Sequence, residues 1–147
     1  MRLSSKQARE WFAKARVARL ATVDPSTAPH IVPVTFAVVG DAVVFAVDHK
    51  PKTTTKLSRL SNIAANEHVC ALVDEYHEDW EQLWWVRADG TARIVRPADS
   101  GADHRASVRA LCDKYAQYAV RPPDGVVVWI DVSRWSGWSG REDVPPR

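Results

Sequence analysis

The strongest constraint on the fold is a pair of dipeptides that favour tight β-turns. Gly40-Asp41 and Asp89-Gly90 each supply the turn residues of a two-residue hairpin. Short apolar runs flank both dipeptides, in pairs: residues 30–39 and 42–47, then residues 83–88 and 91–95. Two such hairpins predict an antiparallel sheet, because strands joined by so short a loop must run in opposite directions.

Pairing across the first turn also predicts which side chains lie opposite each other. Counting outward from the turn places Phe36 opposite Phe45 and Val34 opposite Val47. The remaining elements follow from hydrophobic periodicity. Strands are expected at residues 17–24, 68–76 and 125–138, helices at residues 4–15 and 101–118, and a loose tail at residues 140–147.

A further helix is expected after residue 47. Thr53 or Thr54 would cap it, and an apolar stripe then recurs at helical spacing, made by Leu57, Leu60, Ile63 and Ala64. The element order is therefore α-β-β-β-α-β-β-β-α-β. Strands and helices alternate too rarely for a doubly wound parallel sheet, so a small barrel with helices at its side is the better fit.

Composition narrows the class of protein. A chain of 147 residues predicts a single domain spanning residues 1–147, and no apolar run is long enough for a membrane helix. The N-terminus has no uninterrupted apolar stretch of the signal-peptide kind, so a cytoplasmic protein with two reduced cysteines is expected. A net charge of only +2 argues against a general nucleic-acid binder.

Cations gather directly after the first hairpin. Lys50, Lys52, Lys56 and Arg59 lie in a stretch without acids after Asp48. The threonine-capped helix start offers unpaired backbone N–H groups and the positive end of the helix dipole, an arrangement that binds phosphate. One phosphate rarely needs four cations, which suggests a ligand with several negative groups. The alternative is a solvated charged face.

Pro33 interrupts the apolar run before the first turn. Proline cannot donate to a sheet ladder, so it indicates an edge strand or a bulge. A second interpretation is that backbone groups of Val32, Val34 and Thr35 are free to face a planar ring. Both interpretations can hold at once, and the ring and anion sites would then lie a short distance apart.

At these residues the sequence resembles a known family. The stretches "RLATVDPSTAPHIVPVTF", "AVDHKPKTTTKLSRLSNIAANEHVCALVD" and "LWWVRADGTARIV" are similar to the flavin/deazaflavin oxidoreductases that include the pyridoxamine 5′-phosphate oxidase-like proteins. The resemblance implies a mainly β fold with helices (α+β). That fold is a split β-barrel of six to seven antiparallel strands flanked by short helices. The pattern is similar to the actinobacterial subgroup that uses coenzyme F420, an 8-hydroxy-5-deazaflavin.

The resemblance also implies a cofactor site. Lys50, Lys52, Thr53 and Lys56 would hold the phosphate and acidic tail, with Arg59 beside them, and the deazaflavin ring would lie along Pro33, Val34 and Thr35. The chain would be a homodimer with two cofactor sites at the subunit interface. FMN is the alternative cofactor. The FMN-type pattern expects a basic residue on the strand where this chain has His30, and that departure favours the deazaflavin.

The expected reaction is hydride transfer from reduced F420 to a small organic acceptor. Trp84 and Trp85, with Trp135 and Trp138, are candidates for a stacking wall, although core or dimer packing would explain them equally well. No side chain is assigned as catalytic. No metal site is expected, because the acids of residues 74–79 lack ligand spacing. An FMN-dependent oxidase or reductase and a non-enzymatic carrier remain as alternatives.

Overall fold

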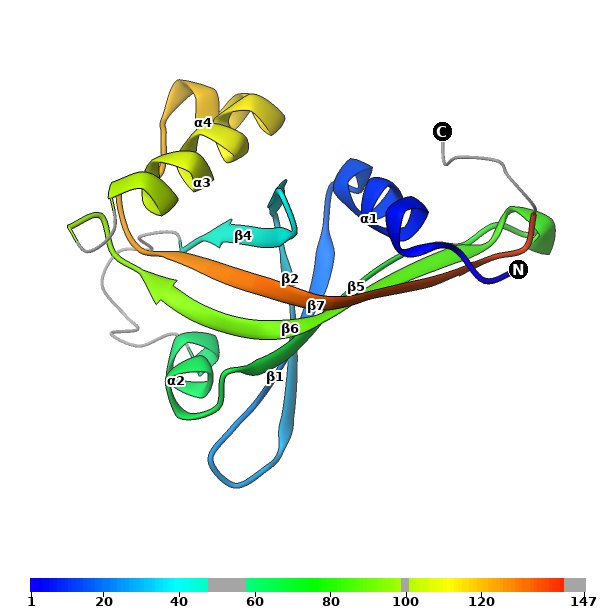
Figure 1. The fold of residues 1–147 in the computed structure, drawn as a ribbon, viewed down its shortest axis with the longest axis horizontal. Helices are drawn as coiled ribbons and strands as arrows, with labels where there is room; N and C mark the ends of the chain where they lie inside the picture. Colours follow the sequence, from blue (N-terminus) through cyan, green and yellow to red (C-terminus); the bar gives the residue numbers. More distant parts are fainter. Residues whose placement is uncertain (48–57, 99–100, 142–147) are drawn as a thin grey trace.

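Seven antiparallel strands form one sheet in the part of the chain that the structure describes. The structure is a computed structural model and describes residues 1–47, 58–98 and 101–141. The strand order is β2-β1-β5-β6-β7-β4-β3 (Figure 1). The strands are β1 (Ala18–Val23), β2 (Pro29–Val34), β3 (Ala37–Val39), β4 (Ala42–Ala46), β5 (His68–Glu75), β6 (Trp84–Val95) and β7 (Val127–Ser139).

The chain itself brings the two edges of this sheet together. β2 and β3 stand at opposite ends of the strand order, yet only Thr35 and Phe36 separate Val34 from Ala37. A connection of this length spans at most about 10 Å. The sheet must therefore curl until its edges meet, which makes it a barrel. The expected split-barrel α+β fold is confirmed.

The first predicted hairpin is present, but its leading strand is shorter than expected. β3 pairs with β4 from Val39↔Ala42 to Ala37↔Val44, and Gly40 has a φ of 58°, as a tight hairpin turn requires. The expected pairing of Val34 with Val47 is wrong, because Val34 lies opposite Ala18 of β1. Residues 30–39 are thus two strands, divided where the chain passes from one edge of the sheet to the other.

The second predicted hairpin is wrong. β6 runs without a turn through Asp89-Gly90, and its pairing with β7 shifts register there by a β-bulge. A Cβ atom added to Gly90 would lie 2.2 Å from the backbone oxygen of Asp131. Glycine is needed here for close approach of two strands and not for a turn. The strand predicted at residues 30–39 is two strands, and the two predicted at residues 83–88 and 91–95 are one. The number of strands in the described part of the chain is therefore seven, the upper value expected from the sequence.

Helices cover the barrel. α1 (Ser5–Lys14) begins with a capping box between Ser4 and Gln7 and buries Trp11 and Phe12. The expected helix at residues 101–118 is divided at Tyr115 into α3 (Gly101–Lys114) and α4 (Ala116–Val120). No helix within the described residues is both long and apolar enough to cross a membrane.

α2 (Ser58–Ala65) only partly matches its predicted apolar stripe. Ile63 is buried as expected, but Ala64 is exposed and Asn62 is buried in its place. The Asn62 side-chain amide donates to Thr22 Oγ1 at 3.1 Å, which satisfies a polar group inside the fold. The expected caps and Leu57 lie outside the described residues. A short 3₁₀ helix, η1 (Trp80–Gln82), precedes β6.

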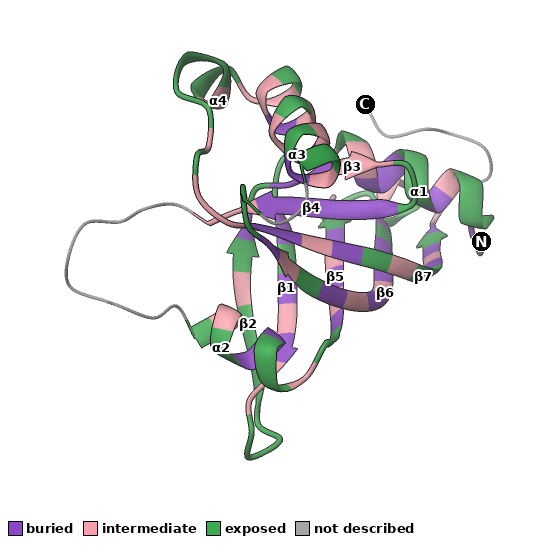
Figure 2. Ribbon diagram, turned by 60° about the vertical axis from the view of Figure 1, so that its left-hand side comes forward, coloured by how far each residue is buried: buried purple, intermediate pink, exposed green. Residues whose placement is uncertain are grey.

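The core has two parts, one inside the barrel and one beneath α3. Figure 2 shows α3 beside β3 and β4, and β4 buried along most of its length. Phe45 of β4 belongs to the barrel cluster, whereas Val44 packs with Leu111 of α3. β4 is thus apolar on both faces because each face meets a different core. This packing brings the α3–α4 junction next to the point where the barrel closes.

Candidate functional site

Two tyrosines from the α3–α4 region hold the connection between β2 and β3. The Phe36 backbone N–H donates to the Tyr115 hydroxyl at 3.1 Å, and that hydroxyl donates to the Arg16 carbonyl at 2.8 Å. The hydroxyls of Tyr118 and Thr35 lie 3.2 Å apart. Burial raises the pKa of Tyr115, so its hydroxyl stays protonated and able to donate at neutral pH. The barrel's closing point is therefore fixed in place by α3 and α4.

A cavity of about 610 Å³ lies at this point. It is lined by Thr35, Val47, Tyr115, Tyr118 and the segment at residues 120–124, among others. Its size falls within the range of small-molecule and cofactor pockets. Val47, directly after β4, lines the cavity and precedes the predicted anion segment in the sequence. Its lining combines aromatic faces with a few polar groups.

The three predicted ring-binding residues have different environments. Thr35 lines the cavity, Pro33 is exposed on β2, and Val34 is buried in the barrel core. β2 is an edge of the strand order, as Pro33 predicted. Pro33 lies opposite Arg19 and has no N–H, so by antiparallel alternation the backbone groups of Val32 face β1.

The same alternation directs the backbone groups of Val34 toward Ala18 of β1. This alternation opposes the expectation that the Val32 and Val34 backbones are free to face a ring, which stays a prediction. Thr35, one residue beyond the ladder, is the member of the predicted set that the cavity contains. Whether Pro33 and Val34 contact a ring through their side chains stays a prediction.

Of the residues predicted to form the anion site, Arg59 lies in the part of the chain that the structure describes. The others (Lys50, Lys52, Thr53 and Lys56) lie outside the described residues. The Arg59 Nε atom is buried and has no hydrogen-bond partner within the part of the chain that the structure describes. A buried donor of this kind costs free energy unless a partner is supplied. An anionic group near the start of α2 would supply one, and to that extent the chain fits an anionic cofactor.

Lys114, which the sequence did not single out, lies against Tyr115, a residue of the cavity lining. Its ammonium donates to the Ala15 carbonyl at 2.6 Å and stands 3.7 Å from the Phe36 ring centroid. Burial, with a smaller contribution from Arg16, lowers the pKa of Lys114 to about 8. The only sequence signal was a cation in the last turn of a helix, which is too common to indicate a site.

Trp84 and Trp85 are not part of this cavity. Both lie at the beginning of β6 and line a separate hollow. Trp84 is buried, packs edge-on against Trp11 at 5.5 Å and donates through Nε1 to Glu75 at 2.7 Å. Trp135 is buried against Phe12 at 5.3 Å and belongs to the barrel core. Within one chain, these side chains form no wall beside Thr35.

Two histidines, His30 and His77, have ordinary structural partners. His30 Nε2 lies 3.1 Å from Asp24 in the β1–β2 hairpin, and His77 Nε2 lies 3.5 Å from Glu75. Hydrogen bonds from Ser26 and the Ala28 backbone, and then from His30, lower the pKa of Asp24 to about 2. Within the described residues no three metal-binding side chains come together.

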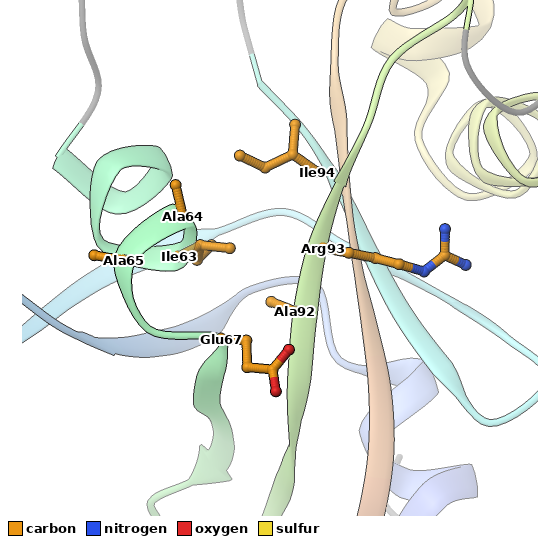
Figure 3. Close-up of a pocket in the computed structure, with 7 residues that line it drawn as sticks. All are labelled: Ile63, Ala64, Ala65, Glu67, Ala92, Arg93 and Ile94. Carbon is orange, nitrogen blue, oxygen red and sulfur yellow. The ribbon is translucent and has the colours of Figure 1, made fainter.

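A hollow of about 350 Å³ lies between α2 and β6 and is shown in Figure 3. It is lined by Ile63, Ala64 and Ala65 of α2 and by Ala92 and Ile94 of β6, and Ile63 extends from α2 toward β6. Arg93 extends to the other side of β6, where its guanidinium pairs with Asp103 at 2.7 Å. With Glu67 as its main polar group, this hollow has no arrangement that would recognise an anionic cofactor.

Comparison with known proteins gives one family. The family model described as pyridoxamine 5′-phosphate oxidase matches residues 4–139. No curated protein matches the sequence.

Solved structures share the fold at low sequence identity. A conserved hypothetical protein from Mycobacterium tuberculosis is 21% identical with a TM-score of 0.74, over 99% of this chain and 91% of that one. An FAD-binding protein from Mycobacterium smegmatis is 23% identical with a TM-score of 0.69, over 94% and 96%. A heme storage protein from Vibrio cholerae is 16% identical with a TM-score of 0.69, over 95% of each chain.

Proposed function

The chain belongs to the pyridoxamine 5′-phosphate oxidase family, and on this premise we propose that it binds a flavin-type cofactor in the cavity beside Thr35. The preferred cofactor in this proposal is coenzyme F420, and the reaction is hydride transfer from its reduced form to a small organic acceptor. FMN is the alternative cofactor.

The observation that carries the proposal is the position of the 610 Å³ cavity. It lies where Thr35, the predicted ring contact, meets Val47, which precedes the predicted anion segment. A flavin-type molecule has a flat ring joined to a charged tail, so it needs these two kinds of contact side by side. The aromatic rings of Tyr115 and Tyr118 give the cavity the apolar lining that such a ring favours.

The choice of F420 over FMN rests on charge. Four cations in residues 50–59 exceed what one phosphate needs, whereas the F420 tail adds several glutamates to its phosphate. The unpartnered Nε of Arg59 is consistent with a tail that extends along the start of α2. These features support the deazaflavin, and direct measurement distinguishes it from FMN.

The residues of the chain would bind, orient and shield the cofactor. When bound, reduced F420 supplies the hydride. The Tyr115 hydroxyl keeps the Thr35–Phe36 connection at one fixed position, so the cavity wall does not have to form when the ligand enters. The Thr35 and Tyr118 hydroxyls offer hydrogen bonds, and Val47 and the Tyr118 ring exclude water. No side chain is assigned as a proton donor.

Removal of two cations tests the proposal. Replacing Lys52 and Lys56 by alanine together should weaken F420 binding at least about tenfold, because charge-assisted hydrogen bonds contribute about 1.5 to 3 kcal/mol each. The matched control replaces Lys6 and Lys14 of α1, two exposed lysines in another element, which changes the net charge equally. Fluorescence titration measures both. Equal affinity in wild type and in the Lys52/Lys56 variant would refute the anion site.

Two further measurements separate the alternatives. Protein made in a host without F420 should be colourless if it uses the deazaflavin and yellow if it retains FMN. Steady turnover of reduced F420 with a panel of acceptors distinguishes an enzyme from a carrier. The carrier alternative is kept because a heme storage protein shares the fold. A titration with F420, FMN and heme therefore belongs in the same experiment.

A homodimer with cofactor sites at the interface is also part of the proposal. Edge strand β2 exposes Ile31 (67% exposed) next to Pro33, and an apolar sheet edge of this kind favours a partner. Light scattering at micromolar concentration should give twice the chain mass. A monomer under those conditions would contradict this part of the proposal.

A further inference from the structure

A hollow with aromatic and acidic walls lies at the end of the sheet away from α4. It has a volume of about 480 Å³. Its walls include Asp74, Glu75, Tyr76, Trp84, Trp85 and Trp138. Figure 1 shows the start of β6 and the end of β7 at the opposite end of the sheet from α3 and α4. The hollow is therefore distinct from the Thr35 cavity.

Sheet register places an acid and two tryptophans in one row. Asp74 of β5 pairs with Trp85 of β6, and Trp85 pairs with Trp138 of β7. Directly paired residues in antiparallel strands point to the same face, so these three side chains stand next to each other. A Cβ atom on Gly137 would lie 2.8 Å from the Trp85 backbone oxygen. Glycine thus lets β7 lie close to β6 beside the Trp85–Trp138 pair.

These aromatic side chains are more exposed than packing alone explains. Trp85 is 37% exposed and Trp138 is 38% exposed, while Tyr76 reaches 65%. Trp84, in contrast, is paired with Glu75 on the opposite face of the strands and is buried against Trp11 in the barrel core. Large aromatic surfaces left open beside a hollow mark a binding site more often than a fold requirement.

The charge of the hollow selects the kind of ligand. The lining residues include two carboxylates and neither lysine nor arginine, in a chain whose net charge is +2. Trp84 and His77 hold Glu75 in place through its Oε2 atom. The Asp74 side chain is exposed and its carboxylate has no ion-pair or hydrogen-bond partner within the described residues. Arg2 forms an isolated backbone β-bridge with Trp138, on the far side of β7 from β6. Trp138 and Trp85 therefore separate Arg2 from Asp74 in this row.

We propose that this hollow binds a small organic cation whose nitrogen carries alkyl groups, such as a trimethylammonium compound. Indole faces attract a cation through their quadrupoles, and alkyl groups on the nitrogen fit an apolar wall better than a hydrated primary ammonium. Asp74, in the same row as the two tryptophans, supplies the opposite charge. This inference is independent of the proposed cofactor, because no residue lines both cavities.

Two ligands of the same shape test the charge requirement. The probe is choline, and the control is 3,3-dimethylbutan-1-ol, which has the same shape without the charge. We expect choline to shift the Trp85 and Trp138 indole N–H signals in NMR spectra in a saturable way. The neutral alcohol should bind at least about tenfold more weakly.

Matched variants test the residues. Asp74→Asn and Trp85→Leu should each weaken choline binding about fivefold or more. Asp113→Asn, at an exposed acid of α3, and Trp129→Leu, at a tryptophan outside the hollow, should leave it unchanged. Circular dichroism confirms that each variant is folded.

Three results would overturn the inference. They are no saturable shift with choline, equal binding of the neutral alcohol, and unchanged affinity in both hollow variants. Loss of choline binding as the protein dimerises on concentration would also overturn it, because a second copy would then be the occupant. Failure here leaves the cofactor proposal intact, since F420 titration reports on the other cavity.

Discussion

Replacing Tyr115 by phenylalanine removes the hydroxyl that fixes the barrel's closing point. That hydroxyl accepts from the Phe36 backbone N–H at 3.1 Å and donates to the Arg16 carbonyl at 2.8 Å. Phe36 is fully buried, so its N–H would lose its partner where water has poor access. The exposed Arg16 carbonyl can bond to water instead. The cost is therefore about that of one buried unsatisfied donor, about 1 to 3 kcal/mol of unfolding free energy.

Urea denaturation followed by tryptophan fluorescence measures this change. The control is Tyr118→Phe, which removes an exposed hydroxyl contact with Thr35 at 3.2 Å and should cost less than about 1 kcal/mol. Tyr115→Phe should also weaken cofactor binding, because Thr35 would no longer be held beside the cavity. If the two variants are equally stable, the reasoning about the buried Phe36 N–H is wrong.

Three other predictions concern stability. Gly90→Ala should lower the free energy of unfolding by about 1 to 3 kcal/mol, because its Cβ would meet the Asp131 backbone. The control is Gly101→Ala, whose Cβ would meet only the flexible end of the Arg105 side chain and should leave stability unchanged. Urea denaturation measures both. In the folded protein the pKa of Lys114 is lowered to about 8, so above that pH the folded chain has lost this proton while the unfolded chain still carries it. Stability should therefore rise between about pH 8 and 9.5 relative to Lys114→Met, and parallel profiles would contradict this. Arg59→Met should leave the cofactor-free protein as stable as wild type, since the buried Nε has no partner within the described residues. A clear loss of stability would show that the guanidinium has a structural role.

The sequence by itself determined the fold class and most of the local structure. Helical periodicity predicts the helix at residues 4–15, Gly40 allows the first turn, and Pro33 marks an edge strand. These signals are local, since each depends on residues a few positions apart and on the preferences of the backbone. They were sufficient to predict a small antiparallel barrel with helices at its side.

Only the tertiary structure decided where strands end and what surrounds the cavity. Asp89-Gly90 has the residues of a hairpin turn, yet contact with Asp131, far along the chain, makes it a bulge in a continuous strand. The chain divides at Thr35 and Phe36 because the barrel closes there, and Tyr115, which holds that point, is 79 residues away. The pKa of Lys114 is lowered for the same kind of reason, since Lys114 is buried against Phe36, far from it in the sequence. Such contacts join residues distant in sequence, and no periodicity or turn preference encodes them.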